Sequence, residues 1–353
     1  MPAASQDGAA TLSSAPPALD AGEASAVAAR LFGVDAAATL LASERDQNFR
    51  LDGGAGESWL LKVSNPSEPA DIVDLQVAAL DHIHARAPGA PVPRVLRNRQ
   101  GDATAAIRLP DGRRTCVRLL TYLEGLPVRG TPRTRAQRVS LGRALAGLDR
   151  ALDGFSHPAA SHDLMWNVAH ADRLAGMIDQ VATGARAAML HAFMNRFRAV
   201  QPQLARLRRQ VIHNDCHLFN VLVAHDDDTR VTGIIDFGDL IEAPLVGEVA
   251  TGAAYQLRGT DDPLGAVAEF VAAYHAVLPL DAGEREIVAE LMATRHLVTV
   301  LITEWRVKRY PENRDYILRH NPESWNALFL MADMGSAALR DRVLSGIDTG
   351  DLR

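Results

Sequence analysis

A group of short strands set inside a helical half is the feature that most constrains how this chain can fold. Residues 211–212, 221–223 and 231–235 are brief apolar segments, typical of buried β-strands. They interrupt a stretch, from about residue 133 to 343, in which apolar residues recur mainly at helical spacing. Polar residues follow the first and third of these segments. Because buried polar groups must find partners, these residues are expected to form hydrogen bonds or a functional site.

The first third of the chain is instead predicted to be mostly β-strand. Two hairpins are expected, because glycine-containing turns at residues 52–56 and 111–112 separate β-compatible segments. One helix is expected over residues 72–83, where Ile, Val and Leu recur at helical spacing. The sequence therefore predicts an α+β fold in three parts: a loosely ordered, Ala-, Ser- and Pro-rich tail at 1–22, an antiparallel N-terminal lobe at 23–121 and a larger, mainly helical C-terminal lobe at 122–353.

Composition and charge exclude several classes of protein. The chain has 353 residues and a formal net charge of −6, so no basic surface for nucleic acid is expected. Its two cysteines cannot form a disulfide framework, which favours a reducing compartment. The sequence has neither the roughly 18 apolar residues of a membrane helix nor the basic and apolar regions of a signal peptide. We therefore expect a cytoplasmic protein that binds neither nucleic acid nor a membrane, in an oligomeric state that the sequence does not determine.

The polar loop HNDCHLFN, at residues 213–220, carries groups that phosphoryl transfer needs. The carboxylate of Asp215 can accept or orient the proton of an attacking hydroxyl, and His213 is placed to hold the loop backbone. Asn220 and Asp236 offer the hard oxygen ligands that Mg²⁺ prefers. The loop therefore predicts a catalytic base beside a magnesium site.

A strand lysine and a DFG sequence complete this interpretation. Lys62, in the apolar segment WLLKV, supplies a cation for the phosphates of a nucleotide. Asp236 begins the sequence DFG, directly after the strand segment at 231–235. A strand lysine, a loop with an Asp and an Asn, and a DFG are the parts of the kinase template. Zinc bound by His213, Asp215, Cys216 and His217 is the alternative, although contiguous residues rarely point four side chains at one centre.

These motifs resemble those of the aminoglycoside phosphotransferase and choline kinase family, whose members are relatives of protein kinases. Within that family, the chain is most similar to the hydroxylysine kinase branch. The resemblance covers about residues 25–345, and the motifs that carry it are DQNF at 46–49, LLKVSN at 60–65, RLLTYLEG at 118–125 and DFGD at 236–239.

The resemblance implies a bilobal, protein-kinase-like fold and a kinase that phosphorylates small molecules. It implies that Asp215 is the base, that Asn220 and Asp236 hold Mg²⁺, and that Lys62 contacts the phosphates. It also implies that the hinge backbone binds the purine, at Leu120, Tyr122 and Leu123. The expected donor is ATP or GTP, and 5-hydroxylysine is the leading acceptor. Aminoglycosides, homoserine and choline are alternative acceptors.

The chain also departs from the family pattern. The loop at 43–49 contains no glycine, so phosphate contacts are expected from side chains such as Asn48. The helix after Lys62 offers Gln76, or Asp74, where the family usually has a Glu partner for this lysine. These two departures support a further alternative, a catalytically silent nucleotide-binding module.

Substrate contacts are predicted at four residues that the chemistry above does not use. The side chain of Asp239 could hold an amine, and the guanidinium of Arg306 could pair with a carboxylate. The ring of Trp166 could stack on a cation. His217 is either a loop residue or a substrate contact. Arg295 and His296 are weaker candidates of the same kind.

Overall fold

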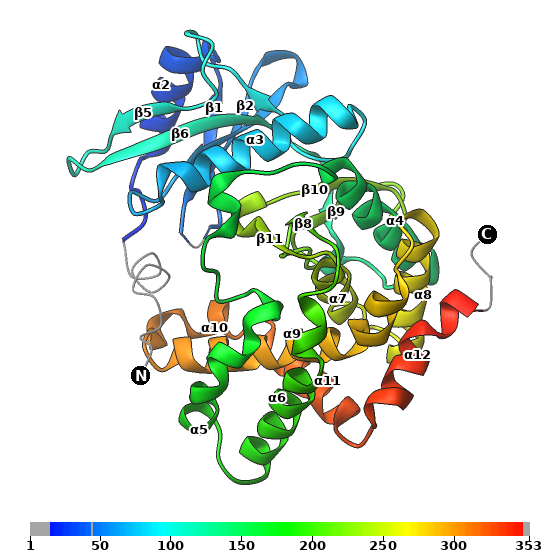
Figure 1. Ribbon diagram of the computed structural model, residues 1–353. Coiled ribbons are helices and arrows are strands. Elements are labelled where there is room, and N and C mark those ends of the chain that lie inside the picture. Colours follow the sequence, from blue (N-terminus) through cyan, green and yellow to red (C-terminus); the bar gives the residue numbers. More distant parts are fainter. Residues whose placement is uncertain (1–14, 44, 349–353) are drawn as a thin grey trace. The chain divides into compact units, whose positions relative to one another are not determined.

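The computed structural model describes residues 15–43 and 45–348 (Figure 1). The chain divides into two compact units. The first consists of Met1–Glu124, His157–Asp163 and Gly233–Ile235, and the second of Gly125–Ser156, Leu164–Thr232 and Asp236–Arg353. The sequence analysis expected a boundary at residue 121 and did not anticipate that two later segments belong to the first unit. In the described ranges, none of the helices combines the length and the apolar composition needed to cross a membrane.

An antiparallel sheet forms the first unit, as the sequence predicts. Its strand order is β1-β2-β3-β6-β4, and β5 also pairs with β6. Both predicted hairpins are present, since β2 pairs with β3 and β5 pairs with β6. The strands are β1 (Ala37–Leu41), β2 (Gln47–Asp52), β3 (Ser58–Val63), β4 (Val95–Leu96), β5 (Ala105–Arg108) and β6 (Arg114–Thr121).

Helix α2 (Ala21–Phe32) is a correction to the sequence analysis, which expected one helix in this region and a loose tail as far as residue 22. Asp20 and Glu23 form a capping box, in which each side chain accepts from the other residue's backbone N–H. The Gln47 side chain also donates to and accepts from the backbone of Leu19, so the chain is fixed ahead of the helix. Residues 1–14 of the predicted tail lie outside the described residues.

Helices α2 and α3 cover opposite faces of the sheet of the first unit. The face toward α2 is apolar and includes Phe49, Leu61 and Val117. Because side chains alternate along a strand, Lys62 and Arg118 belong to the other face, where α3 (Ala70–Arg86) lies (Figure 1). This helix contains the predicted segment at 72–83. The sheet therefore directs its cationic side chains toward α3.

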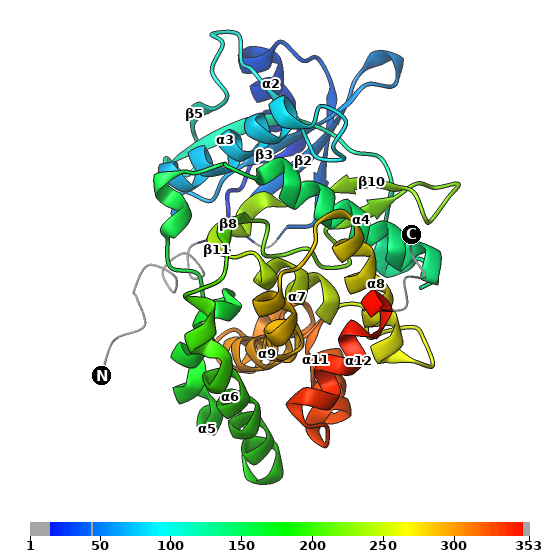
Figure 2. The same ribbon diagram turned by 45° about the vertical axis from the view of Figure 1, so that its right-hand side comes forward.

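The second unit is mostly helical and is built around α9 (Ala282–Val307). Helices α6, α7, α11 and α12 all pack against α9 (Figure 2). Residues on all faces of α9 are buried, as expected for a helix inside a core. The other helices of the unit are α4 (Arg135–Leu152), α5 (Ile178–Val181), α6 (Gly184–Leu204), α7 (Val246–Ala254), α8 (Pro263–Val277), α10 (Arg314–Ile317), α11 (Asn321–Ala332) and α12 (Ser336–Asp348).

The strands predicted inside the helical half are also present. They are β8 (Arg209–Ile212), β9 (Val221–Val223) and β10 (Val231–Ile234), and they are joined by β7 (Leu126–Pro127) and β11 (Ile241–Pro244). β8 pairs with β11 and β9 pairs with β7, both antiparallel. The α+β fold predicted from the sequence is confirmed.

Candidate active site

The loop that connects β8 to β9 is held firmly at its start. Asn214 has a φ of +63°, in the left-handed region that Asn adopts more readily than most residues. Its backbone N–H donates to Oε2 of Glu248, a fully buried residue of α7, at 2.7 Å. Helix α7 therefore fixes the backbone immediately before Asp215.

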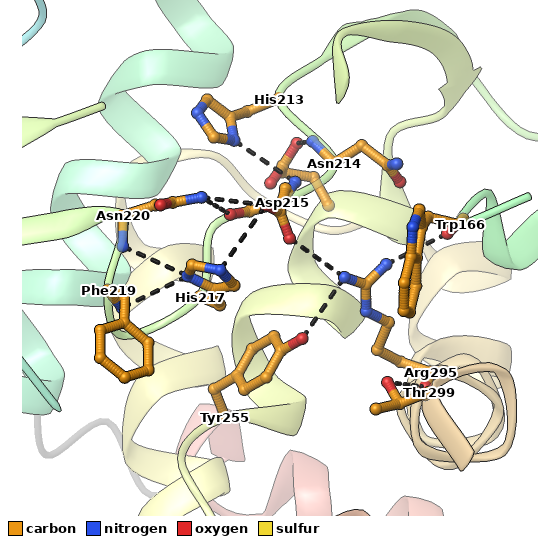
Figure 3. Close-up of polar contacts among 11 residues, drawn as sticks. Trp166, His213, Asn214, Asp215, His217, Phe219, Asn220, Tyr255, Arg295 and Thr299 are labelled. Atoms are coloured by element: carbon orange, nitrogen blue, oxygen red, sulfur yellow. Dashed lines mark hydrogen bonds and ion pairs between the residues drawn. The ribbon is translucent and has the colours of Figure 1, made fainter. Parts of the chain in front are cut away.

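The carboxylate of Asp215 has a donor on each oxygen (Figure 3). Asn220 Nδ2 donates to Oδ2 at 2.9 Å, and Arg295 Nη2 donates to Oδ1 at 3.2 Å. His217 Nε2 lies 3.7 Å from Oδ2. The side chain remains 21% exposed. The carboxylate is thus oriented by the protein, and a reacting hydroxyl can still reach it.

Burial raises the pKa of Asp215 to about 7. The positive charge of Arg295 opposes this increase, and the negative charge of Asp236 adds to it. Arg319 and the hydrogen bond from Asn220 also lower the pKa. A carboxylate with a pKa near neutrality is a better proton acceptor than an ordinary Asp, which suits a general base.

Arg295 of α9 is a residue that sequence reasoning does not identify as the partner of Asp215. It lies 80 residues beyond Asp215 in the chain and is only 2% exposed. Nη2 also donates to the hydroxyl of Tyr255 at 3.3 Å, and Nη1 donates to the carbonyl of Trp166 at 3.1 Å. No local motif marks such a residue, because the packing of α9 brings it to the loop.

The two histidines of the loop bind its backbone. His213 Nδ1 accepts from the N–H of Asp215 at 3.3 Å, and its ring meets that of Phe237 edge-on. His217 Nδ1 accepts from the N–H groups of Phe219 and Asn220 at 3.3 and 3.2 Å. Burial, assisted by the charge of Arg319, lowers the pKa of His217 to about 3 and keeps its ring neutral.

The zinc alternative is therefore wrong. The ring nitrogens Nδ1 of His213 and His217 are both used by the backbone, and burial raises the pKa of the Cys216 thiol, which disfavours the thiolate that zinc binds. Within residues 15–43 and 45–348, no group of three or more His, Cys, Asp or Glu side chains could hold a metal ion.

Asn220 and Asp236 present a different donor set, which fits a magnesium ion. The amide nitrogen of Asn220 faces Asp215, with bonds to its carbonyl at 3.0 Å and to its carboxylate at 2.9 Å. The amide oxygen is therefore the end that a cation would use. Asp236 is exposed, has a φ of +64°, and lies near enough for its charge to raise the pKa of Asp215. One amide and one carboxylate oxygen are ligands typical of Mg²⁺ bound with nucleotide phosphates.

Lys62 has a carboxylate partner that the sequence analysis did not name. Its Nζ lies 3.1 Å from Oδ2 of Asp46, and both side chains are largely buried. Asp46 Oδ1 also accepts from the backbone N–H of Asn65 at 2.9 Å. Burial by itself would raise the pKa of Asp46. Lys62, Arg118 and the Asn65 N–H outweigh burial, so this pKa lies below its ordinary value.

The expectation that Gln76 or Asp74 pairs with Lys62 is wrong, because both side chains have other partners. Gln76, buried on α3, accepts with its side-chain oxygen from Arg118. Asp74 instead lies 3.1 Å from the ring of His157. The partner of Lys62 is therefore the charged residue Asp46 and not the neutral Gln76. A neutral partner for this lysine no longer supports the alternative of a catalytically silent module.

The residues expected at the purine are also used by the sheet. Leu120 lies within β6, between Leu60 and Val95 of the neighbouring strands. The N–H of Tyr122 donates to the carbonyl of Ser58 at 3.3 Å. Leu123 is the next residue after this bond to β3. Asn48 lies directly opposite Lys62 in the ladder of β2 and β3.

The remaining candidates for substrate contacts have partners or positions inside the second unit. Trp166 faces a cation of the protein itself, since the guanidinium carbon of Arg295 is 5.3 Å from its ring centre. Burial by itself would lower the pKa of Arg295, but Tyr255 and Asp215 raise it, and the charge of Asp239 adds to this increase. Arg306 is buried in the last turn of α9.

A cavity of about 340 Å³ adjoins this network within the second unit. Tyr255, which accepts from Arg295, forms part of its wall, as do His320 and the ion pair of Arg258 with Glu323 at 2.9 Å. The volume lies within the range of small-molecule sites, about 300–1,000 Å³.

Comparisons with known proteins identify the family of the chain. Residues 37–291 match the phosphotransferase enzyme family. Mouse (Mus musculus) hydroxylysine kinase is 27% identical over 352 residues, which cover 93% of each chain.

Solved structures show the same fold. A microcompartment-associated aminopropanol kinase is similar with a TM-score of 0.64 and 20% identity, over 91% of this chain and 97% of the other. An amicoumacin kinase, solved with AMP-PNP, Ca²⁺ and Ami, is similar with a TM-score of 0.64 and 14% identity, over 82% of this chain and 87% of the other. The chain belongs to the phosphotransferase enzyme family, and it is an enzyme that transfers a phosphoryl group to a hydroxyl acceptor.

Proposed function

We propose that this enzyme transfers the γ-phosphoryl group of ATP or GTP to the hydroxyl of a small hydroxylated amine or amino acid, with 5-hydroxylysine as the leading acceptor. The observation that carries the proposal is the carboxylate of Asp215. It is oriented by Asn220 and Arg295, it has a pKa raised to about 7, and it stays partly exposed. These are the properties required of a group that accepts a hydroxyl proton.

Each side chain has one proposed role in the transfer. Asp215 orients the acceptor hydroxyl and takes its proton, while His213 and Glu248 keep the loop backbone in place. Asn220 and Asp236 would hold Mg²⁺, which, when bound, neutralises negative charge on the phosphates. Lys62, fixed by Asp46, contacts the phosphates.

The purine is proposed to bind the backbone that follows β6. The N–H of Tyr122 donates to the carbonyl of Ser58 and is not available to a purine. The next backbone N–H along the chain is that of Leu123. Leu120 is proposed to act through its side chain, because its backbone lies between two strands.

The acceptor is proposed by likeness to relatives. Hydroxylysine kinases match along nearly the whole chain, and bovine (Bos taurus) hydroxylysine kinase is 26% identical over 90% of it. The cavity in the second unit has a volume suited to an amino acid, and a contact of the acceptor with Asp239, His217, Trp166 or Arg306 stays a prediction.

A screen of two nucleotides against a panel of acceptors tests this proposal. ATP and GTP are each combined with 5-hydroxylysine, homoserine, choline and an aminoglycoside, and both nucleotide consumption and phosphorylated product are measured. We expect a phosphorylated amino acid with one of the two nucleotides. We expect Asp215→Asn to lower turnover by about 10²–10⁴-fold, the usual size of a general-base effect.

The outcomes separate the candidates. Product from homoserine, choline or the aminoglycoside, and none from hydroxylysine, would replace the proposed acceptor. Near-normal turnover of a folded Asp215→Asn variant would remove Asp215 from its role.

A further inference from the structure

We infer that Arg295 is a positioning residue for phosphoryl transfer, which acts by fixing the carboxylate of Asp215 from the side opposite Asn220. This inference rests on the proposed role of Asp215. It concerns a residue of α9 that is distant in sequence from every motif of the site, and whose effect on the reaction is exerted through another side chain.

The guanidinium of Arg295 is held by three separate parts of the second unit (Figure 3). Its own backbone belongs to α9, Nη1 is bound to the carbonyl of Trp166, and Nη2 is bound to the hydroxyl of Tyr255. The rings of Trp166 and Tyr255 lie 5.3 and 6.0 Å from its central carbon. A group with so many partners has little freedom to move.

This fixed group reaches Asp215 on the oxygen that the loop does not hold. Asn220 binds Oδ2 from within the loop, and Arg295 binds Oδ1 from α9. Two donors on different oxygens define both the position and the rotation of a carboxylate, whereas one donor leaves it free to turn. Loss of about 1 Å in placement can cost about 10²-fold in rate.

Direct binding of substrate does not explain this arginine. The residue is 2% exposed, and both Nη atoms already donate to protein oxygens. A role in packing alone would not require the guanidinium to donate to the carboxylate that is proposed to accept the proton.

A double-mutant cycle tests the inference. Arg295→Met, Asp215→Asn and the double variant are compared with the wild type, using the acceptor that the wild type phosphorylates. We expect Arg295→Met to lower kcat about 10²-fold, with both KM values within about threefold of the wild type. We expect the double variant to be no slower than Asp215→Asn alone, because an arginine that acts through Asp215 has nothing left to position.

Two further variants guard against a mere loss of folding. Arg295→Lys keeps the charge and is expected to recover part of kcat. Arg196→Met is the matched control, because Arg196 of α6 forms an ion pair with Glu290 of α9 at 2.8 Å, away from Asp215. It is expected to lower the melting temperature and to leave kcat within about twofold.

The results that would overturn the inference are distinct from failure of the proposed function. Multiplying effects in the double variant, or a raised KM for the acceptor with kcat unchanged, would make Arg295 a packing or binding residue. A crystal structure of Arg295→Met tests the geometry without turnover. The Asp215 carboxylate should turn about its remaining bond to Asn220, so that Oδ1 leaves its wild-type position. A carboxylate that stays in place would contradict the inference. A wild type that transfers phosphate to no acceptor would refute the proposed function, and that crystal structure would still decide whether Arg295 positions the carboxylate of Asp215.

Discussion

Lys62 pairs with a residue that the sequence analysis did not expect. The sequence analysis looked for the partner on the following helix, at Gln76 or Asp74, and the structure places Asp46 there. The β2–β3 register indicates which residues lie close to Lys62. Asn48 lies opposite Lys62, and Asp46, two residues earlier and just before β2 begins, follows the same alternation toward the lysine. A register predicted from the glycine turn would have found it.

Arg295 and Glu248 could not have been found in this way. Each binds the loop between β8 and β9 from a helix, and no spacing in the sequence relates either residue to Asp215. The position of the polar loop was predictable, because short apolar segments flank it and form β8 and β9. The roles of its residues in phosphoryl transfer stay predictions.

The partnership of Asp46 with Lys62 predicts a defect in nucleotide binding. Asp46→Asn removes the negative charge that holds the lysine, and hydrogen bonds to charged groups contribute about 1.5–3 kcal/mol. We expect the KM for the nucleotide and its dissociation constant to rise about tenfold, with a smaller change in kcat.

Asp52→Asn is the control for this prediction, because Asp52 lies at the far end of β2, the strand that Asp46 precedes, and pairs with Arg50 at the surface. Nucleotide affinity that is equally unchanged in both variants would show that Lys62 does not depend on Asp46.

At the scale of elements, strands with turns between them were predicted better than helix starts. The hairpins follow from their glycine turns, and the strands of the helical half follow from short apolar runs. Helix α2 was missed because its alanine-rich first turns resemble the tail before them. The signal for it was the pair Asp20 and Glu23, three residues apart, followed by Gly33 with a φ of +75° at the other end.

The capping box predicts that α2 contributes measurably to stability. Asp20→Ala removes the side chain that accepts from the N–H of Glu23, and such a loss costs about 0.5–2 kcal/mol. We expect the free energy of unfolding in denaturant to fall by that amount. Asp35→Ala, at an exposed position just after the helix, is expected to change it by less than about 0.5 kcal/mol. Equal stability of the two variants would mean that α2 unfolds separately from the rest.

At the scale of the whole molecule, buried titratable groups set opposing dependences of stability on pH. Burial raises the pKa of Asp215 and of Glu248 to about 7, so the folded chain keeps protons that the unfolded chain releases above about pH 4. This contribution to stability is lost as the pH rises toward 7. Burial lowers the pKa of His217 and His296 to about 3, which has the opposite effect. Because the two sets offset each other, the wild type alone cannot reveal either.

A comparison with His296→Gln isolates one of these contributions. Burial, and then the charge of Arg295, keep His296 neutral in the folded chain, while the unfolded chain takes up a proton below its ordinary pKa of 6.5. The stability that His296 provides is therefore present above pH 6.5 and is lost as the pH falls. We expect the difference in unfolding free energy between wild type and variant to shrink by about 2 kcal/mol from pH 8 to pH 5.

Urea titrations at several pH values measure this difference, with His191→Gln, an exposed position on α6, as the control. A difference that stays constant over this range would show that His296 is protonated in the folded protein.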